Sequence, residues 1–533
     1  MLPRVLLLCV AIFTTWWCLF HGGIPDDAGS CGPDGCIPSS PNRTPTRRHG
    51  YFLHITDTHM DENYVASASV GSACHRKPRP DDKERMKRVG YLGAPGKRCD
   101  APVELTKQTL QWIAREWKDK LDFVIWTGDN SRHDWDRKDL RNRNQVLQLN
   151  KIAADMMMDV FGDTDITIIP CLGNNDVYPH NRPVDHDSIY HFYQQIWGKW
   201  IPPSQRQAFQ KGGYFAIDTA SYRVLSLNSM YFLKRNKRVK NCRKSGPARD
   251  HLIWLEQELQ RARDDKTQVV IIGHVPPSPR DYRKTCFREY LRISSEYKDV
   301  ITSQHYGHLN MDHFLLYDAD HLDVIQEYDI QQQNQQHMIV NDSPIRITRN
   351  IERYVDWLRD LYLSMGFEEN PSSSLNYQAM AAPLKDNNLD DDYDDVLDSL
   401  VAVQVSPSVL PVYYPSIRVY RYNASTSAPM PTLLGYTQYY ANITRWELEH
   451  PGEPLAYAVE YTTESDYGLK DLSPRSLFKL AKHMIEEDDA MWNQYTRNMF
   501  VRTQNETFPG YDEDDDDDDE DGDDDDDDGE DSF

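Results

Sequence analysis

The chain has 533 residues and a formal net charge of -25. Eighteen acidic residues and no basic one lie between Asp512 and Asp531, so the rest of the chain carries only -7. Hydrophobic residues make up 39% of the chain and aromatic residues 11%, which suffices for a sizeable core and excludes a globally disordered or fibrous protein. At roughly 150 residues per domain, the length allows one large domain with insertions or two to three smaller ones.

An apolar run from Val5 to Phe20 follows Arg4 near the N-terminus. Extended to Ile24, this run approaches the roughly 20 residues that span a bilayer. We expect residues 1–24 to be an uncleaved signal anchor. The positive charge before it and the two aspartates after it favour a cytosolic N-terminus and a lumenal body, as in a single-pass type II membrane protein. Residues 25–50 are predicted to be a linker.

Cysteines and glycosylation sequons agree with an oxidising lumen. A disulfide from Cys74 to Cys99, or from Cys242 to Cys286, would each close a polar, basic loop, although spacing alone does not fix the connectivity. Cys171 lies inside an apolar run and is the natural unpaired cysteine. The five sequons are at Asn42, Asn341, Asn423, Asn442 and Asn505.

After the linker, short apolar runs alternate with helical patterns, which predicts an α/β domain whose strands lead into loops at one edge. The expected strands are 51–56, 123–127, 166–172, 223–228 and 268–273. Helices are expected over 110–121 and 252–259, where apolar residues recur at spacings of three and four.

The later part of the chain is divided by composition. Residues 321–408 are Gln-rich and then acidic, and are predicted to be insertions with a mobile acidic loop. Residues 409–505 are predicted to form further strands and a helix from Ser473 to about Met499, packed on the core. Residues 506–533 are predicted to be a disordered acidic tail.

Polar motifs follow four of the expected strands, and a fifth motif follows a later apolar run that ends at Tyr306. They are Asp57-Thr58-His59, Gly128-Asp129-Asn130, Gly173-Asn174-Asn175-Asp176, Gly273-His274 and Gly307-His308-Leu309-Asn310. Any one of them would be an ordinary capping or core-satisfied polar residue. Together, in this order, they supply the hard oxygen and imidazole ligands suited to two divalent ions bridged by one carboxylate.

In this order, the motifs D-T-H, G-D-N, G-N-N-D, G-H and G-H-L-N resemble those of the calcineurin-like metallophosphoesterase superfamily. The stretches G-D-N-S-R-H-D and Y-G-H-L-N-M-D-H-F look like its acid sphingomyelinase branch. H-I-T-D-T-H-M-D-E-N-Y, G-A-P-G-K-R-C-D-A-P and Y-G-L-K-D-L-S-P-R-S-L look like the fungal vacuolar endopolyphosphatases. The resemblance implies a four-layer αββα sandwich, with the catalytic domain over 51–320, inserted loops and a C-terminal α+β extension.

The same resemblance implies the activity and the ligands. The expected reaction is hydrolysis of internal phosphoanhydride bonds of long-chain inorganic polyphosphate by a hydroxide that two divalent ions (manganese, cobalt, magnesium, zinc or iron) activate, in a vacuolar lumen. The implied ligands are Asp57 and His59 for the first ion, Asp129 as the bridge, and Asn174, His274 and His308 for the second. Asn310 stands where many relatives have a further histidine ligand, so it is a weaker candidate.

The predicted proton donor also departs from the family pattern. Asn175 replaces the histidine that many relatives use to protonate the leaving group. We expect His133 to take that role, with His180 behind it. A phosphate terminus leaves with a second pKa near 6, so polyphosphate tolerates the loss of the usual histidine better than a lipid alkoxide would.

Basic residues gather beside the metal motifs. Nine Lys and Arg against three acids lie between residues 76 and 98, and eight with no acid between residues 234 and 249. Although any one of them would be an ordinary solvated side chain, the clusters favour a groove for a polyanion. The predicted substrate contacts are Arg76, Lys77, Arg79, Arg132, Lys237, Arg238 and Arg280. No aromatic-interleaved motif accompanies them, so nucleic acid is not the expected partner.

Two other functions stay open. A sphingomyelinase-like phosphodiesterase is disfavoured by the basic loops and by the linker of only about 25 residues before the first motif, which leaves no room for a lipid-presenting domain. A non-catalytic lumenal binder of metal or polyphosphate would fit the weakened positions Asn175 and Asn310. The acidic tail is expected to be a solubilising extension, and a sharper hypothesis has it compete with polyphosphate for the basic groove.

Overall fold

The computed structural model describes residues 49–78, 89–183, 188–320, 349–365, 399–424 and 431–503, with the backbone alone at 349–352. All of them belong to one compact unit. The predicted signal anchor, the linker up to residue 48 and the acidic tail lie outside these residues. Within the described ranges, no helix combines the length and the apolar character needed to cross a membrane.

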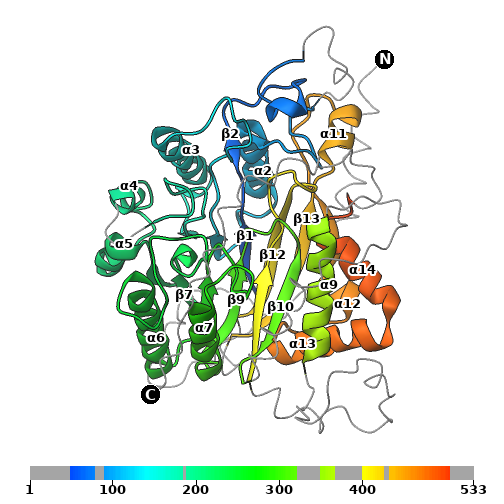
Figure 1. Cartoon of the computed structure of the whole chain (residues 1–533). Coiled ribbons are helices and arrows are strands. Elements are labelled where there is room, and N and C mark those ends of the chain that lie inside the picture. Colours follow the sequence, from blue (N-terminus) through cyan, green and yellow to red (C-terminus); the bar gives the residue numbers. More distant parts are fainter. Residues whose placement is uncertain are drawn as a thin grey trace, which may run out of the picture. The chain divides into compact units, whose positions relative to one another are not determined.

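The first of two six-stranded sheets has the strand order β14-β13-β12-β1-β4-β5 (Figure 1). β1, β4 and β5 are parallel, and β12, β13 and β14 continue the sheet in antiparallel pairing. Its strands are β1 (His49–Ile55), β4 (Phe123–Trp126), β5 (Thr167–Pro170), β12 (Ser416–Asn423), β13 (Leu433–Tyr440) and β14 (Ala458–Thr462). Half of this sheet therefore comes from the C-terminal part of the chain.

The second sheet has the order β10-β11-β9-β8-β7-β6. β7, β8, β9 and β11 are parallel, with one antiparallel strand at each edge. Its strands are β6 (Phe215–Asp218), β7 (Arg223–Ser226), β8 (Val269–Ile272), β9 (Ile301–Tyr306), β10 (His313–Asp318) and β11 (Leu400–Val405). A short pair, β2 (Met60–Asp61) and β3 (Ala101–Pro102), lies beside the loop that follows β1.

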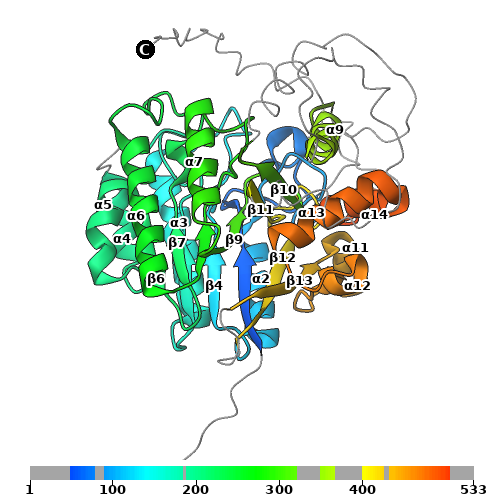
Figure 2. The ribbon, with the colours of Figure 1, turned by 90° about the horizontal axis from the view of Figure 1, so that it is seen from below.

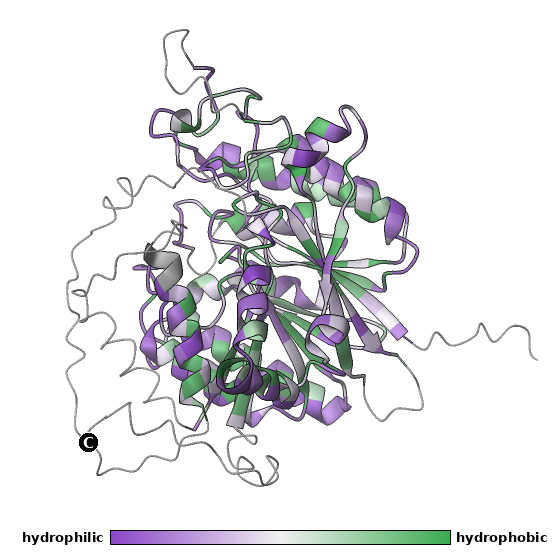
Figure 3. Cartoon of the chain, turned by 90° about the vertical axis from the view of Figure 1, so that its right-hand side faces the viewer, coloured by the Kyte–Doolittle hydropathy of each residue, from purple (hydrophilic) through white to green (hydrophobic). Residues whose placement is uncertain are grey.

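The two sheets pack face to face through aromatic side chains. The rings of Phe52 in β1 and Tyr420 in β12 lie 5.5 and 4.6 Å from that of His305 in β9. Neighbouring side chains of a strand point to opposite faces. Tyr51, next to Phe52, accordingly contacts Trp117 on the outer side, at the end of helix α2 (Val103–Glu116). Figure 3 shows hydrophobic residues concentrated along the central strands, as expected for strands buried on both faces.

Helices cover the outer faces of the sandwich. α2 packs on the first sheet, where Trp112 contacts Tyr439 of β13, and α6 and α7 lie side by side against the second sheet (Figures 1 and 2). The helices are α2 (Val103–Glu116), α3 (Arg143–Phe161), α4 (Ser188–Ile196), α5 (Arg206–Gly212), α6 (Pro247–Asp265), α7 (Lys284–Glu296), α9 (Arg349–Ser364), α11 (Ile443–Glu449), α12 (Thr463–Tyr467), α13 (Pro474–Lys482) and α14 (Asp489–Met499). The predicted four-layer fold class is confirmed.

Two boundaries differ from those predicted. Residues 400–405, assigned to an insertion, form the buried strand β11, because this short apolar run has a partner on each side, β9 and β10. The helix expected from Ser473 to Met499 is two helices. After a π-helical turn over His483–Glu487, the chain takes an extended conformation at Asp488, whose side chain caps α14 by accepting from the Met491 amide.

Candidate active site

The predicted metal ligands lie just beyond the carboxyl ends of five strands. Asp57 and His59 follow β1, Asp129 follows β4, and Asn174 follows β5. His274 and His308 come from the second sheet, after β8 and β9. The ligands that follow strands of the first sheet contact those that follow strands of the second sheet. Both sets of strand ends therefore lie at one edge of the sandwich, where ligands bind in open α/β sheets.

Asp129 stands at the centre of the cluster. Its Oδ2 lies 3.3 Å from Nε2 of His59 and 3.2 Å from Nε2 of His274. The donor atoms of Asp57, His59 and Asp129 all lie within 4.8 Å of one another, and so do those of Asp129, His274 and His308. Two donor groups that share one carboxylate are the arrangement that two bridged ions require.

Asn174 adds an amide oxygen to the second of these groups. Its Oδ1 lies 2.8 Å from Nε2 of His274, and its Nδ2 donates to Nε2 of His180, also at 2.8 Å. His180 thereby turns the Asn174 oxygen towards the cluster. The structure thus brings six of the predicted ligands together.

Backbone carbonyls orient two of the imidazoles. Nδ1 of His59 donates to the Ser131 carbonyl at 3.1 Å, and Nδ1 of His274 donates to the Thr127 carbonyl at 2.8 Å. Each ring therefore directs Nε2 at the cluster. Metal-binding histidines are commonly fixed in this way by a hydrogen bond from the other ring nitrogen.

The ligand loops adopt an uncommon backbone conformation. Asp57, His59, Asp129, His308 and Asn310 all have positive φ, between 36 and 72°. Non-glycine residues rarely adopt this left-handed region, and clusters of them mark functional sites. Asn310 shares this conformation, but no hydrogen bond in the described structure joins it to the cluster, and its buried Oδ1 lacks a partner there.

Asp176 holds two of these loops together, a role that the sequence analysis did not assign. Its carboxylate accepts hydrogen bonds from the backbone amides of Gly173, Asp129 and Asn130, at 2.9, 2.7 and 2.8 Å. A side chain at Gly173 would come within 2.1 Å of Oδ1 of Asp129, so this close approach needs glycine. In the sequence, the only indication of this role was that Asp176 is the last residue of the G-N-N-D motif.

Charge coupling in the cluster is strong. Burial raises the pKa of Asp129, but the imidazoles of His274, His59 and His308 outweigh it and hold this pKa well below its ordinary value. Burial lowers the pKa of His274, but Asp129 and Asp57 outweigh it and raise this pKa to about 9. The carboxylates and imidazoles of the cluster thus stabilise one another's charged forms.

The donor set fits divalent cations. Carboxylate and amide oxygens and imidazole nitrogens are the ligands of magnesium, manganese, zinc and iron sites. Oδ1 of Asp57 is fully buried and has no hydrogen-bond partner within the described ranges, although its Oδ2 accepts from Thr56 and from the His308 amide. A buried carboxylate oxygen without a hydrogen-bond partner favours binding of a cation.

His133 stacks on the cluster from the side. Its ring lies 4.1 Å from that of His59 and 4.2 Å from that of Trp135. Asp100 accepts from the ring Nδ1 at 2.7 Å and from the His133 amide at 2.9 Å. The sequence analysis missed Asp100, although the quoted motif G-A-P-G-K-R-C-D-A-P contains it. The predicted role of His133 towards the leaving group stays a prediction.

Asn175, at the position of the missing histidine, donates to Asp129 instead. Its amide and its Nδ2 reach the two carboxylate oxygens of Asp129 at 2.7 and 2.8 Å. Asn175 therefore orients the central carboxylate.

The predicted substrate contacts are distributed unevenly. Lys77, Lys237 and Arg238 are exposed, while Arg79 lies outside the described residues. Arg132 is 1% exposed and donates to the carbonyls of His133 and Asp139, a geometry that favours a structural role over substrate contact.

Two of these arginines already have partners. Arg76 binds both carboxylate oxygens of Asp136 and holds the pKa of that carboxyl below its ordinary value. The guanidinium of Arg280 lies 5.5 Å from the ring of Tyr354 and 5.6 Å from that of Trp357, both in α9. Their roles towards substrate stay predictions.

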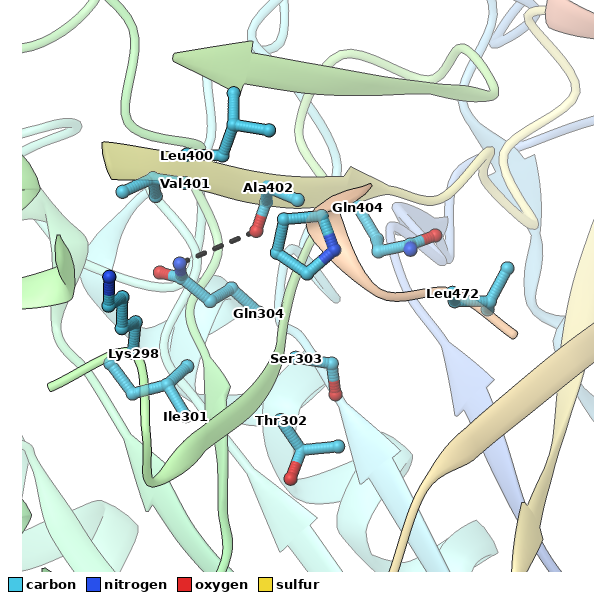
Figure 4. A pocket seen from close by; sticks show the side chains of 11 residues that line it. Lys298, Ile301, Thr302, Ser303, Gln304, Leu400, Val401, Ala402, Gln404 and Leu472 are labelled. Atoms are coloured by element: carbon cyan, nitrogen blue, oxygen red, sulfur yellow. Dashed lines mark hydrogen bonds between the residues drawn. The ribbon is translucent and has the colours of Figure 1, made fainter. Parts of the chain in front are cut away.

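A small hollow of about 60 Å³ lies between β9 and β11 (Figure 4). Its lining includes Ile301 to Gln304 and Leu400 to Ala402, and Gln304 crosses it to donate to the Ala402 carbonyl at 3.4 Å. Ile301 to Gln304 begin β9 and Leu400 to Ala402 begin β11, whereas His308 follows the carboxyl end of β9. The hollow is therefore not part of the candidate active site.

The structure contains the two disulfides that the sequence left open as pairings. Cys74 is bonded to Cys99 and Cys242 to Cys286, while Cys171 is free and buried. Of the sequon asparagines, Asn423 ends β12 and Asn442 caps α11 by accepting from the Arg445 amide. Asn42, Asn341 and Asn505 lie outside the described residues, and glycosylation stays a prediction.

Comparison with known proteins agrees with this geometry. The calcineurin-like phosphoesterase family model matches residues 50–309, and the model of the acid sphingomyelin phosphodiesterase C-terminal region matches residues 398–509. The chain is 32% identical over 412 residues to a Cryptococcus neoformans protein named endopolyphosphatase, and 34% identical over 443 residues to one from Neurospora crassa.

These alignments cover 70% and 76% of this chain, and 58% of the length of each relative. A solved dimetal phosphatase from Danio rerio aligns with a TM-score of 0.32 and 12% sequence identity. This alignment covers 51% of this chain and 84% of the Danio rerio chain. Residues 50–309, which carry strands of both sheets and all the predicted metal ligands except Asn310, therefore match the calcineurin-like phosphoesterase family.

Proposed function

We propose that this chain is an endopolyphosphatase, a metal-dependent hydrolase that cuts internal phosphoanhydride bonds of long-chain inorganic polyphosphate. The observation that carries the proposal is the pair of donor groups sharing Asp129, in a chain 32 to 34% identical to fungal endopolyphosphatases. A basic loop beside the site supports a polyanionic substrate.

Two divalent ions in the donor groups around Asp129 would polarise the phosphoryl oxygens and lower the pKa of an attacking water. The protein's own part is to fix these groups before substrate arrives. Asn175 orients Asp129, and Asp176 holds the loops that carry Asp129 and Asn174. Such prior orientation avoids the cost of rearranging dipoles during the reaction.

The leaving group is a phosphate terminus. His133 is 22% exposed at its side chain, and Asp100 holds its Nδ1, which leaves Nε2 to face a substrate. Because a phosphate terminus needs little proton assistance, help from His133 would be modest.

We propose a vacuolar membrane location with the described unit in the lumen. The apolar run at residues 5–20 supports an anchor, and the two disulfides support an oxidising compartment.

A sphingomyelinase-like phosphodiesterase is the second candidate, because residues 398–509 match the acid sphingomyelin phosphodiesterase C-terminal region. The similarity to endopolyphosphatases and the exposed basic loop favour polyphosphate over this lipid.

One assay separates the candidates. The purified full chain is incubated with long-chain polyphosphate or with sphingomyelin, each with manganese, cobalt, magnesium or a chelator, and the products are resolved by length. Chains of intermediate length, absent with chelator, are expected. Single phosphates alone would indicate attack from the ends, choline phosphate would support the second candidate, and no product with intact metal binding would support a binder.

A further inference from the structure

A cationic loop, residues 233–246, connects the 3-10 turn after β7 to helix α6. It contains no acidic residue, and all of its basic side chains are exposed. They are Lys234, Arg235, Lys237, Arg238, Lys240, Arg243 and Lys244. The loop therefore presents a dense positive surface.

Carboxylates do not neutralise most of this charge. Within the described part of the chain, none pairs with Lys234, Arg235, Lys240, Arg243 or Lys244. Other surface arginines differ, since Arg263 pairs with Asp299 and Arg292 with Glu289. Like charges held together repel one another, and a bound polyanion relieves the repulsion.

Buried contacts fix the backbone of the loop. Cys242 is bonded to Cys286 in α7, and the completely buried Asn236 donates to the carbonyls of Pro183 and Met230 at 3.2 and 3.1 Å. The guanidinium of Arg283 donates to the carbonyls of Lys234 and Asn236. A loop ordered in advance loses little conformational entropy when a ligand binds.

The same contacts tie the loop to segments that leave the active site. Lys234 donates its amide to the carbonyl of Asp281, in the segment that starts at His274. The Pro183 carbonyl accepts a hydrogen bond from Asn236, and Pro183 lies at the end of the segment that runs from Asn174 through His180. The cationic loop is therefore joined to two of the three segments that follow ligands of the second predicted ion, those after Asn174 and His274.

We propose that the cationic loop is a preformed anchoring site for inorganic polyphosphate, separate from the metal ligands, and that it gives the enzyme its preference for long chains. The inference rests on the proposed function. A chain long enough to reach both sites gains binding energy at the loop through a high effective concentration, whereas a short one does not. Anchoring away from the scissile bond also favours internal cuts.

The test replaces Lys240, Arg243 and Lys244 with Gln in the full chain, because these exposed side chains make no hydrogen bond or ion pair in the described structure. The matched control replaces three exposed lysines elsewhere in the chain with Gln, namely Lys107 in α2, Lys470 in the segment before α13, and Lys479 in α13. Both variants lose three positive charges. Thermal melting verifies that both are folded.

The loop variant is expected to raise KM for long-chain polyphosphate about tenfold at low salt and to leave kcat unchanged. The slope of log KM against log salt should fall by about 2, at roughly 0.7 per lost phosphate contact. With tripolyphosphate, both variants should match the wild type. Equal KM values and slopes in the loop and control variants would overturn the inference, and so would an equal loss on both substrates.

Binding separates this inference from the proposed function. Fluorescently labelled long-chain polyphosphate is titrated into each protein with chelator present, so that no hydrolysis is needed. The loop variant should bind about tenfold more weakly than the control. If the wild type cleaves neither substrate with any metal, the proposed function fails, while weaker binding by the loop variant would still support the anchor and equal binding would exclude it.

Discussion

At the scale of single residues, Asp129 is the ligand that joins the two donor groups. It faces His59 and His274 and accepts two hydrogen bonds from Asn175. We expect Asp129→Asn to lower kcat on polyphosphate about 10³-fold, because the amide removes the charge that would bridge two cations. Kinetics and bound-metal content measure the effect.

The matched control is Asp163→Asn, a surface carboxylate paired with Lys118, which should retain full activity. Retained activity in Asp129→Asn would contradict the two-ion assignment.

His251 predicts a pH dependence of stability. It is completely buried between Tyr214 and Phe232, both ring nitrogens lack partners in the described structure, and burial lowers its pKa to about 3. The unfolded chain binds a proton near pH 6.5, whereas the folded chain does not until about pH 3. The free energy of unfolding should therefore fall as the pH drops below 6.5, by about 2 kcal/mol at pH 5 from this residue.

His251→Phe should remove that part of the slope, since phenylalanine keeps the stacking and takes up no proton. Urea unfolding between pH 7.5 and 5 measures it. Tyr214→Phe, which alters the same cluster but keeps the histidine, should retain the wild-type slope, and an unchanged slope in His251→Phe would show that this residue does not carry the effect.

At the scale of elements, the strand-end motifs could be predicted from the sequence because each follows an apolar run directly. The roles of Asp100 and Asp176 could not, since they depend on which loops meet after folding. Strand β11 was missed because five apolar residues and one glutamine after an acidic stretch carry no periodic signal, and only pairing with β9 and β10 defines them. The break at Asp488 could not be predicted, because the apolar residues before and after it recur at helical spacing.

The disulfide between Cys242 and Cys286 stabilises the junction of the cationic loop and α7. Its 44-residue separation predicts that the double replacement by Ala lowers the free energy of unfolding by roughly 4 kcal/mol, mainly because the unfolded chain gains freedom. Denaturant unfolding without reductant measures the change. Cys171→Ala removes a buried cysteine without a crosslink, so it should cost clearly less, and an equal cost would contradict the crosslink explanation.

At the scale of the whole molecule, acidic and basic charge are separated along the chain. Eighteen acids lie in the terminal run, and the cationic loop is strongly basic. We expect deletion of residues 512–533 to lower KM for polyphosphate about threefold at low salt, because one competing polyanion is removed, and to have little effect at high salt, where screening weakens the competition. Steady-state kinetics across salt concentrations measure this. An unchanged KM at every salt concentration would mean that the tail is only a solubilising extension.

In the first sheet, strands from the beginning and the end of the described chain lie side by side. This arrangement also sets the order in which the site can be completed during synthesis. β1 needs β12 as its second neighbour, and their pairing joins His49 to Asn423. The amides of Val409 and Leu410 donate to the carbonyls of Thr56 and Asp57, at 3.2 and 2.8 Å. The loop that carries the first two predicted ligands thus receives its final hydrogen bonds from residues made about 350 positions later. A ribosome-bound chain that ends before this region has the metal-binding side chains but lacks the bonds that shape their loop, so catalytic competence is acquired late in translation.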